Sequence, residues 1–291
     1  MKYPNLLVIG AQKAGTTWLH KRLKEHPDVF MTETKEVHHF TRPNWREMIE
    51  EYAAHFVDSG PETWAGESSP GYLWSADPSS EFYQPGKPRN DDVPGAVHEI
   101  LGADVRLLVG LRHPVDRAVS AYFHHFRYNR FEPGQSILDI GKKFGIIDMG
   151  FYRKHMEMWL SRFDRSNFHV MLFDDLQTRP ADCWNDVCDF LALKRVDLPA
   201  VTKAANPGFN LTFRDNAIQI DQDSKNPKNI KFMENGDEGS SKAASASITL
   251  DELKTLHEMY RDDIAWVEQT FDAARLGWSS KISDLVSEPV V

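Results

Sequence analysis

The chain has little of what a disulfide-bonded or membrane-spanning protein requires. Cysteine occurs only twice in 291 residues, at Cys183 and Cys188, and this Cys-x4-Cys pair alone is neither a disulfide framework nor a zinc motif. We expect two reduced core thiols, which fits a cytoplasmic protein. No run of about eighteen apolar residues is present, so no membrane span is expected. An apolar strand is expected within a few residues of Met1, so no signal peptide is expected either.

The sequence also lacks the basic charge that is typical of nucleic-acid-binding proteins. It contains 34 Lys and Arg against 43 Asp and Glu, which gives a formal net charge of −9. This balance argues against a nucleic-acid partner. Apolar residues make up 41 % of the chain, enough for a sizeable core. Nothing in the sequence indicates the oligomeric state.

Short apolar runs that alternate with helical patterns predict the fold class. Runs of strand length occupy 5–10, 104–111 and 167–173. Helices are expected to follow them over 16–26, 114–126 and 180–191, with Pro114 and Pro180 in first turns, and an amphipathic helix is expected over 249–271. The pattern predicts a single α/β domain over 1–291, with a mostly parallel central sheet flanked by helices.

Two polar stretches are predicted to be irregular. Residues 75–94 are rich in proline and are expected to form a long surface loop. Residues 224–247 are rich in Asn, Lys, Ser, Gly and Ala and contain few residues that could build a core. We expect this second stretch to be either disordered or a mobile lid.

The segment Gly10-Ala11-Gln12-Lys13-Ala14-Gly15-Thr16-Thr17-Trp18 joins a predicted strand to a predicted helix. Backbone N–H groups and the helix dipole make such a junction an anion site, and Gly15 permits close approach of a phosphate. A Walker A loop places its lysine directly after the second glycine. Here Thr16 follows Gly15 and Lys13 precedes it by two residues. The loop is therefore P-loop-like without being a Walker A loop.

A second anion-binding element is predicted where another strand ends. Arg112 closes the run 104–111, and Ser120 lies eight residues later in the next helix. The carboxyl end of a strand faces the ligand crevice of an open α/β sheet. The planar guanidinium of Arg112 suits a phosphate, and the Ser120 hydroxyl can add a donor.

Together, these two elements resemble those of the PAPS-dependent sulfotransferase family (PAPS is phosphoadenosine phosphosulfate), closest in motif to its heparan-type and bacterial branch. Lys13, Gly15, Thr16, Thr17 and Leu19 match the 5′-phosphosulfate loop, and Arg112 with Ser120 matches the 3′-phosphate motif. The resemblance implies PAPS as co-substrate, phosphoadenosine phosphate (PAP) as product and no metal. It assigns nucleotide binding to Lys13, Ala14, Gly15, Thr16, Thr17, Trp18, Arg112 and Ser120, with Trp18 against the adenine.

The candidate acid–base residues lie in the segment Thr34-Lys35-Glu36-Val37-His38-His39-Phe40. The Glu-Val-His sequence resembles the heparan-type branch, which implies Glu36 as the base and His38 as its catalytic neighbour. From its place in the loop 10–18, Lys13 is expected to stabilise the leaving phosphate. The cytosolic branch uses a histidine base, so His38 and His39 remain alternatives. Either kind of group could accept a hydroxyl proton.

The resemblance has two departures. Ser68 stands where the heparan-type branch has a second lysine. The Lys-Gly-Arg element that closes over the nucleotide is also missing, and the candidates to replace it are Lys225, Lys228, Lys231 and Lys242. The first departure puts a polysaccharide acceptor in doubt.

The expected reaction is in-line transfer of a sulfuryl group from PAPS to a hydroxyl or amine of an acceptor that the sequence does not identify. A carbohydrate, a lipid and a small molecule all remain open. The main alternative is a P-loop NTPase or small-molecule kinase, in which the run 169–174 ending in Asp174 would be a Walker B strand. A nucleotide-binding module without catalysis is a third hypothesis.

Overall fold

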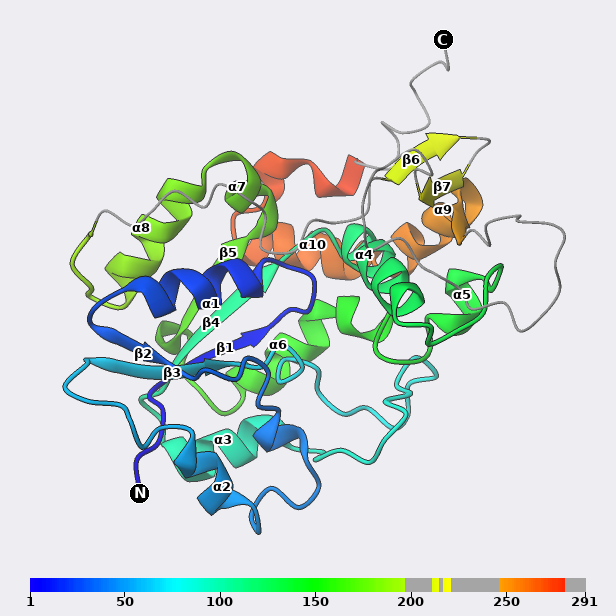
Figure 1. Cartoon of the computed structure of the whole chain (residues 1–291). Helices are drawn as coiled ribbons and strands as arrows, with labels where there is room; N and C mark the ends of the chain where they lie inside the picture. The colour runs from blue at the N-terminus through cyan, green and yellow to red at the C-terminus, as the bar shows by residue number, and fades with distance from the viewer. Residues whose placement is uncertain (197–210, 215–216, 221–245, 281–291) are drawn as a thin grey trace, which may run out of the picture.

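The structure is a computed structural model that describes residues 1–196, 211–214, 217–220 and 246–280 (Figure 1). Most of the polar stretch predicted over 224–247, with its four lysines, lies outside the described residues. Its last two residues are described, and Ser247 begins a strand.

A five-stranded parallel sheet is the centre of the fold (Figure 1). Its strands are β1 (Leu6–Gly10), β2 (Val29–Met31), β3 (Trp64–Ser68), β4 (Arg106–Leu111) and β5 (Phe168–Leu172), in the order β2-β3-β1-β4-β5. The predicted α/β class and mostly parallel sheet are confirmed. The sequence analysis missed β2, which has only three residues, and β3, whose sequence WAGES lacks an apolar run.

Side chains of β1 alternate between two core clusters, as the pleat of a strand requires. Leu6 and Val8 pack in one cluster with residues of α1 (Thr16–Glu25) and α8 (Pro180–Phe190). Leu7 and Ile9 pack in the other. This second cluster includes residues of α3 (Val93–Leu101), α4 (Pro114–Arg127) and α6 (Tyr152–Leu160). Both faces of the sheet are thus covered, which explains why β1 is apolar throughout.

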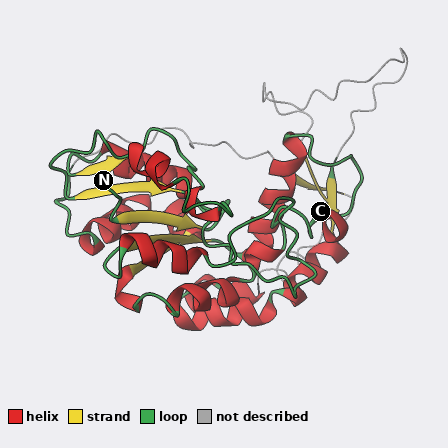
Figure 2. Ribbon diagram, turned by 90° about the horizontal axis from the view of Figure 1, so that it is seen from below, coloured by secondary structure: helices red, strands yellow, loops and turns green. Residues whose placement is uncertain are grey.

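A small antiparallel sheet lies apart from the central sheet, beside α9 (Figures 1 and 2). It contains β6 (Leu211–Arg214), β7 (Ala217–Ile220) and β8 (Ser247–Thr249), none of which was predicted. Ile248 of β8 belongs to the same core cluster as Leu7 and Ile9 of β1. The two sheets therefore share one hydrophobic core.

The single helix predicted over 249–271 is wrong, because the chain forms two helices there. They are α9 (Leu250–Met259) and α10 (Arg261–Thr270). Tyr260 separates them with φ −95° and ψ 2°, and its buried hydroxyl donates to the carbonyl of Ile147 at 2.6 Å. This tertiary hydrogen bond has no signature in the local sequence. The other α-helices of the described residues are α2 (Ile49–Ala54), α5 (Ile137–Ile140) and α7 (Phe173–Thr178).

Three smaller predictions can also be compared with the structure. Cys183 and Cys188 are free and buried, as expected. The proline-rich segment is irregular from Ser75 to Asp92, but α3 begins at Val93, so the end of the predicted loop is helical. Within the ranges that the structure describes, no helix is long and apolar enough to cross a membrane.

Candidate active site

The loop between β1 and α1 packs closely against β4 and α7 through glycines. The amide of Ala11 donates to the carbonyl of Gly110 in β4 at 2.7 Å, and a Cβ on Gly110 would lie 2.3 Å from the Ala14 oxygen. Gly15 has φ 89°, and its Cβ would lie 2.6 Å from the Leu176 side chain. Only glycine fits either position without displacement. Gly110 was missed, although a glycine inside an apolar strand often marks a close backbone approach.

Lys13 and Arg112 lie side by side at the carboxyl ends of β1 and β4. The Arg112 guanidinium donates to the carbonyl of Lys13 at 3.4 Å and lies 4.8 Å from the Phe173 ring. The Tyr152 hydroxyl fixes the Arg112 backbone by donating to its carbonyl at 2.8 Å. The structure therefore brings together the two predicted anion-binding elements, which are about a hundred residues apart in sequence.

The cations of this site are largely buried, and Arg112 and Arg127 repel Lys13. Burial and the positive charges of Arg112 and Arg127 lower the pKa of Lys13 to about 8, while Glu36 opposes the shift. Burial also lowers the pKa of Arg112. An anion between the two cations would relieve their repulsion and raise both pKa values.

Glu36 is an ionised carboxylate near this site. It accepts hydrogen bonds from Lys35 at 2.6 Å and lies 3.4 Å from the Nε2 of His38. The hydrogen bond with His38, helped by Lys35, lowers the pKa of Glu36 to about 2 against the opposing effect of burial. The Glu36 side chain is 45 % exposed and so is accessible to an acceptor.

The structure separates the two alternative histidines. His38 is half-exposed beside Glu36. His39 is buried and stacks on Tyr52 with ring centroids 4.3 Å apart, and burial lowers its pKa to about 4. His39 therefore has a packing role, and His38 is the histidine that lies beside Glu36.

The other predicted nucleotide-binding residues occupy the expected elements. Thr16, Thr17 and Trp18 form the first turn of α1, where Thr16 is buried and the ring of Trp18 packs 5.9 Å from the Arg22 guanidinium. Ser120 lies half-buried in α4. Contact of Trp18 with adenine stays a prediction.

Two residues of α4 that the sequence analysis missed are electrostatically linked to this site: Arg127 lowers the pKa of Lys13, and Lys13 lowers that of His124. His124 and Arg127 follow Ser120 by four and seven residues, the spacing of one helical face. Burial lowers the pKa of His124 to about 4, with further lowering by Lys13, Arg130 and Arg127. The helical spacing from Ser120 is the signal that could have identified them.

The acid proposed to end a Walker B strand lies in a helix. Asp174 and Asp175 lie in the first turn of α7 rather than in β5. Asp175 pairs with Arg275 and, at 2.9 Å, with Arg179, and these partners lower its pKa. No group of three metal-ligating side chains occurs in the part of the chain that the structure describes.

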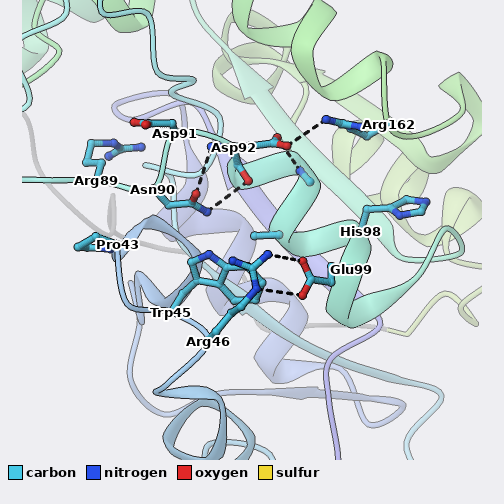
Figure 3. A pocket seen from close by; sticks show the side chains of 12 residues that line it. Pro43, Trp45, Arg46, Arg89, Asn90, Asp91, Asp92, His98, Glu99 and Arg162 are labelled. Carbon is cyan, nitrogen blue, oxygen red and sulfur yellow. Dashed lines mark hydrogen bonds and ion pairs between the residues drawn. The ribbon is translucent and has the colours of Figure 1, made fainter.

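A cavity of about 620 Å³ lies elsewhere, along α3 (Figure 3). Arg46 pairs with Glu99 at 2.6 Å and Arg162 with Asp92 at 3.0 Å across its wall. None of Lys13, Glu36, Arg112 and Ser120 lines it. The cavity is thus distinct from the site at the strand ends.

Comparison with known proteins identifies the family of this chain. A model of the sulfotransferase domain family matches residues 3–268. Human heparan sulfate glucosamine 3-O-sulfotransferase 5 is 26 % identical over 221 residues, which cover 72 % of this chain and 58 % of the relative. Human heparan sulfate glucosamine 3-O-sulfotransferase 6 is 29 % identical over 208 residues, which cover 67 % of this chain and 54 % of the relative. The chain thus spans little more than half the length of these curated relatives.

A solved structure is similar as well. The sulfotransferase from Alicyclobacillus acidocaldarius has a TM-score of 0.54 and 26 % sequence identity, with 71 % of this chain and 88 % of that chain covered.

Proposed function

The chain belongs to the sulfotransferase domain family, and from this premise we propose that it transfers a sulfuryl group from PAPS to a hydroxyl or amine. The observation that carries this proposal is that Lys13, Arg112 and Glu36 belong to one site. One loop supplies a cation, a strand end supplies a second cation, and the neighbouring segment supplies an ionised base.

Each of these groups has a separate role in the proposed reaction. The acceptor oxygen or nitrogen attacks sulfur as the bond from sulfur to the bridging phosphate oxygen breaks, and PAP leaves. Glu36 takes the acceptor's proton. Lys13, Thr16 and Thr17 offset the charge that grows on the leaving phosphate, and such aimed donors typically contribute about 3 kcal/mol each. Arg112 and Ser120 hold the 3′-phosphate.

The acceptor class stays open among carbohydrates, lipids and small molecules. The names of the curated relatives favour a glucosamine-containing polysaccharide, but Ser68 replaces the lysine that this branch carries. A cytoplasmic location also stays a prediction, supported by the two free cysteines.

Nucleotide binding separates this function from that of an NTPase. PAP is expected to bind without magnesium and ATP to bind far more weakly, because Lys13 precedes Gly15 and the site offers no described carboxylate cluster for a metal. Calorimetry with both nucleotides, in magnesium and in chelator, tests this. Tight magnesium-dependent ATP binding with hydrolysis would overturn the proposal.

PAP binding is also expected to weaken as the pH rises. Lys13 is charged below its pKa of about 8 and loses its proton above it, whereas a bound anion would hold the proton. Affinity should fall by up to about tenfold between pH 7 and pH 9, with proton uptake on binding at the higher pH. Lys13→Arg stays charged throughout and should remove this dependence. An unchanged pH dependence in Lys13→Arg would show that another group titrates.

A further inference from the structure

A completely buried carboxylate lies behind the segment that carries Glu36. Glu67 is 0 % exposed near the end of β3. The Ser69 hydroxyl donates to its Oε2 at 2.7 Å, the Tyr52 hydroxyl donates to its Oε1 at 3.4 Å, and Tyr72 supplies a further hydrogen bond. Burial raises the pKa of Glu67, and these hydroxyls oppose the shift. Burial of a carboxylate destabilises the folded state, so we expect this residue to serve a function.

Two of these hydroxyls also hold the backbone of residues 36–40. The amide of His38 donates to Ser69 Oγ at 2.9 Å, and the amide of Phe40 donates to the Tyr72 hydroxyl at 3.4 Å. The amide of Glu36 donates to the Ser68 carbonyl at 2.8 Å. Every second amide of the segment is therefore held by residues 68–72.

The hydroxyls of Ser69 and Tyr72 accept from amides, so each needs a hydrogen-bond acceptor for its own proton, and Glu67 is that acceptor. The Ser69 hydroxyl donates to Glu67 and the Tyr72 hydroxyl also hydrogen-bonds to it, so both hydroxyls direct their protons toward the carboxyl group. Their lone pairs then face the amides of His38 and Phe40. The hydrogen bonds from amide to hydroxyl to carboxylate all run in one direction, so each hydrogen bond polarises and strengthens the next.

The segment needs this support because its backbone is unusual. Glu36 has φ 66° and His38 has φ 55°, in the left-handed region that residues other than glycine rarely adopt. Such conformations persist only where surrounding contacts fix them, and they gather at functional sites. The contact that holds His38 leads through Ser69 to Glu67, whereas the Glu36 amide is held by the neighbouring Ser68 carbonyl.

We propose that Glu67 is a positioning residue: its carboxylate orients the hydroxyls of Ser69 and Tyr72, which hold residues 36–40 so that Glu36 faces the acceptor. This role rests on the proposed function of Glu36 as the base. Glu67 itself is buried and touches no substrate.

A matched pair of serine variants tests the proposal. Ser69→Ala removes the link from Glu67 to the His38 amide. Ser68→Ala removes a buried hydroxyl from the next residue, which contacts His20 Nδ1 at 3.0 Å and holds the Glu36 amide only through its backbone. The readouts are PAP affinity, the hydrolysis of PAPS with water as acceptor, and hydrogen exchange of the amides of residues 36–40.

Ser69→Ala is expected to slow PAPS hydrolysis by about tenfold or more with little change in PAP affinity, because a displaced base loses its alignment. In Ser69→Ala the His38 amide should exchange its hydrogen faster. In Ser68→Ala the exchange of this amide should stay slow and turnover should stay normal. Tyr72→Phe should likewise expose the Phe40 amide more than Tyr52→Phe does. Glu67→Gln, which offers only one accepting oxygen, should combine these effects.

Two results would overturn the proposal. One is unchanged turnover or unchanged amide exchange in Ser69→Ala and Tyr72→Phe. The other is an equal loss of turnover in Ser68→Ala, which would show a general effect of damage to the core. Glu36→Gln is measured alongside: normal turnover in that variant would refute the assignment of the base, whatever the serine variants show.

Discussion

Glu36→Gln is expected to slow sulfuryl transfer by about a hundredfold or more while PAP affinity stays nearly unchanged. Glutamine keeps the size and shape of the side chain but cannot accept the acceptor's proton. His38 and Lys35 lower the pKa of Glu36 to about 2, so the carboxylate is unprotonated at neutral pH. The same shift makes it a weak base, so the acceptor's proton moves to it only as the acceptor bonds to sulfur. The measurement is the single-turnover rate with any acceptor found, or the rate of PAPS hydrolysis, beside calorimetric PAP affinity.

Glu33→Gln is the matched control for this variant. It removes one negative charge three residues before Glu36, but Glu33 is 87 % exposed and pairs with Lys24 at 2.7 Å. Its turnover should stay normal. If Glu36→Gln reacts normally while His38→Ala is inactive, the base is His38 and the chemistry is closer to that of the cytosolic branch.

The sequence predicted those parts of the site that depend on backbone signals. A strand, a glycine-containing turn and a helix start lie together in 10–18, and a strand end with a proline-opened helix lies in 112–120. Both arrangements carry local signals, and the structure has them within one or two residues of the predicted bounds. Lys13 and Arg112 then lie side by side, because the carboxyl ends of parallel strands lie at the same edge of the sheet.

The missed parts depend on contacts between distant segments. Glu67, Ser69 and Tyr72 were missed as supporting residues, because nothing local reveals that their side chains hold residues 36–40. The break at Tyr260 likewise depends on a hydrogen bond to Ile147, more than a hundred residues away. Local propensity cannot anticipate such bonds, since tertiary context overrides it.

Arg112→Ala is expected to weaken PAP binding by about a hundredfold, which corresponds to about 2.7 kcal/mol. Arg112 is proposed to hold the 3′-phosphate, which PAP and PAPS share, so the loss should appear in affinity for both nucleotides. Calorimetric titration with PAP measures it. Arg112→Lys should recover only part of the affinity, because an ammonium lacks the planar fork that binds two phosphate oxygens.

Arg106→Ala is the matched control, because Arg106 begins the same strand β4 and donates to the carbonyl of Ser166 at 2.8 Å. It removes an equal charge at the opposite end of the strand and should leave PAP affinity unchanged. Lys13→Ala provides the contrast within the site: it should lower turnover more than affinity, since its charge is most useful as the bridging oxygen becomes anionic. If Arg112→Ala lowered turnover but not PAP affinity, Arg112 would act on the reacting phosphosulfate, and the assignment of the 3′-phosphate would be wrong.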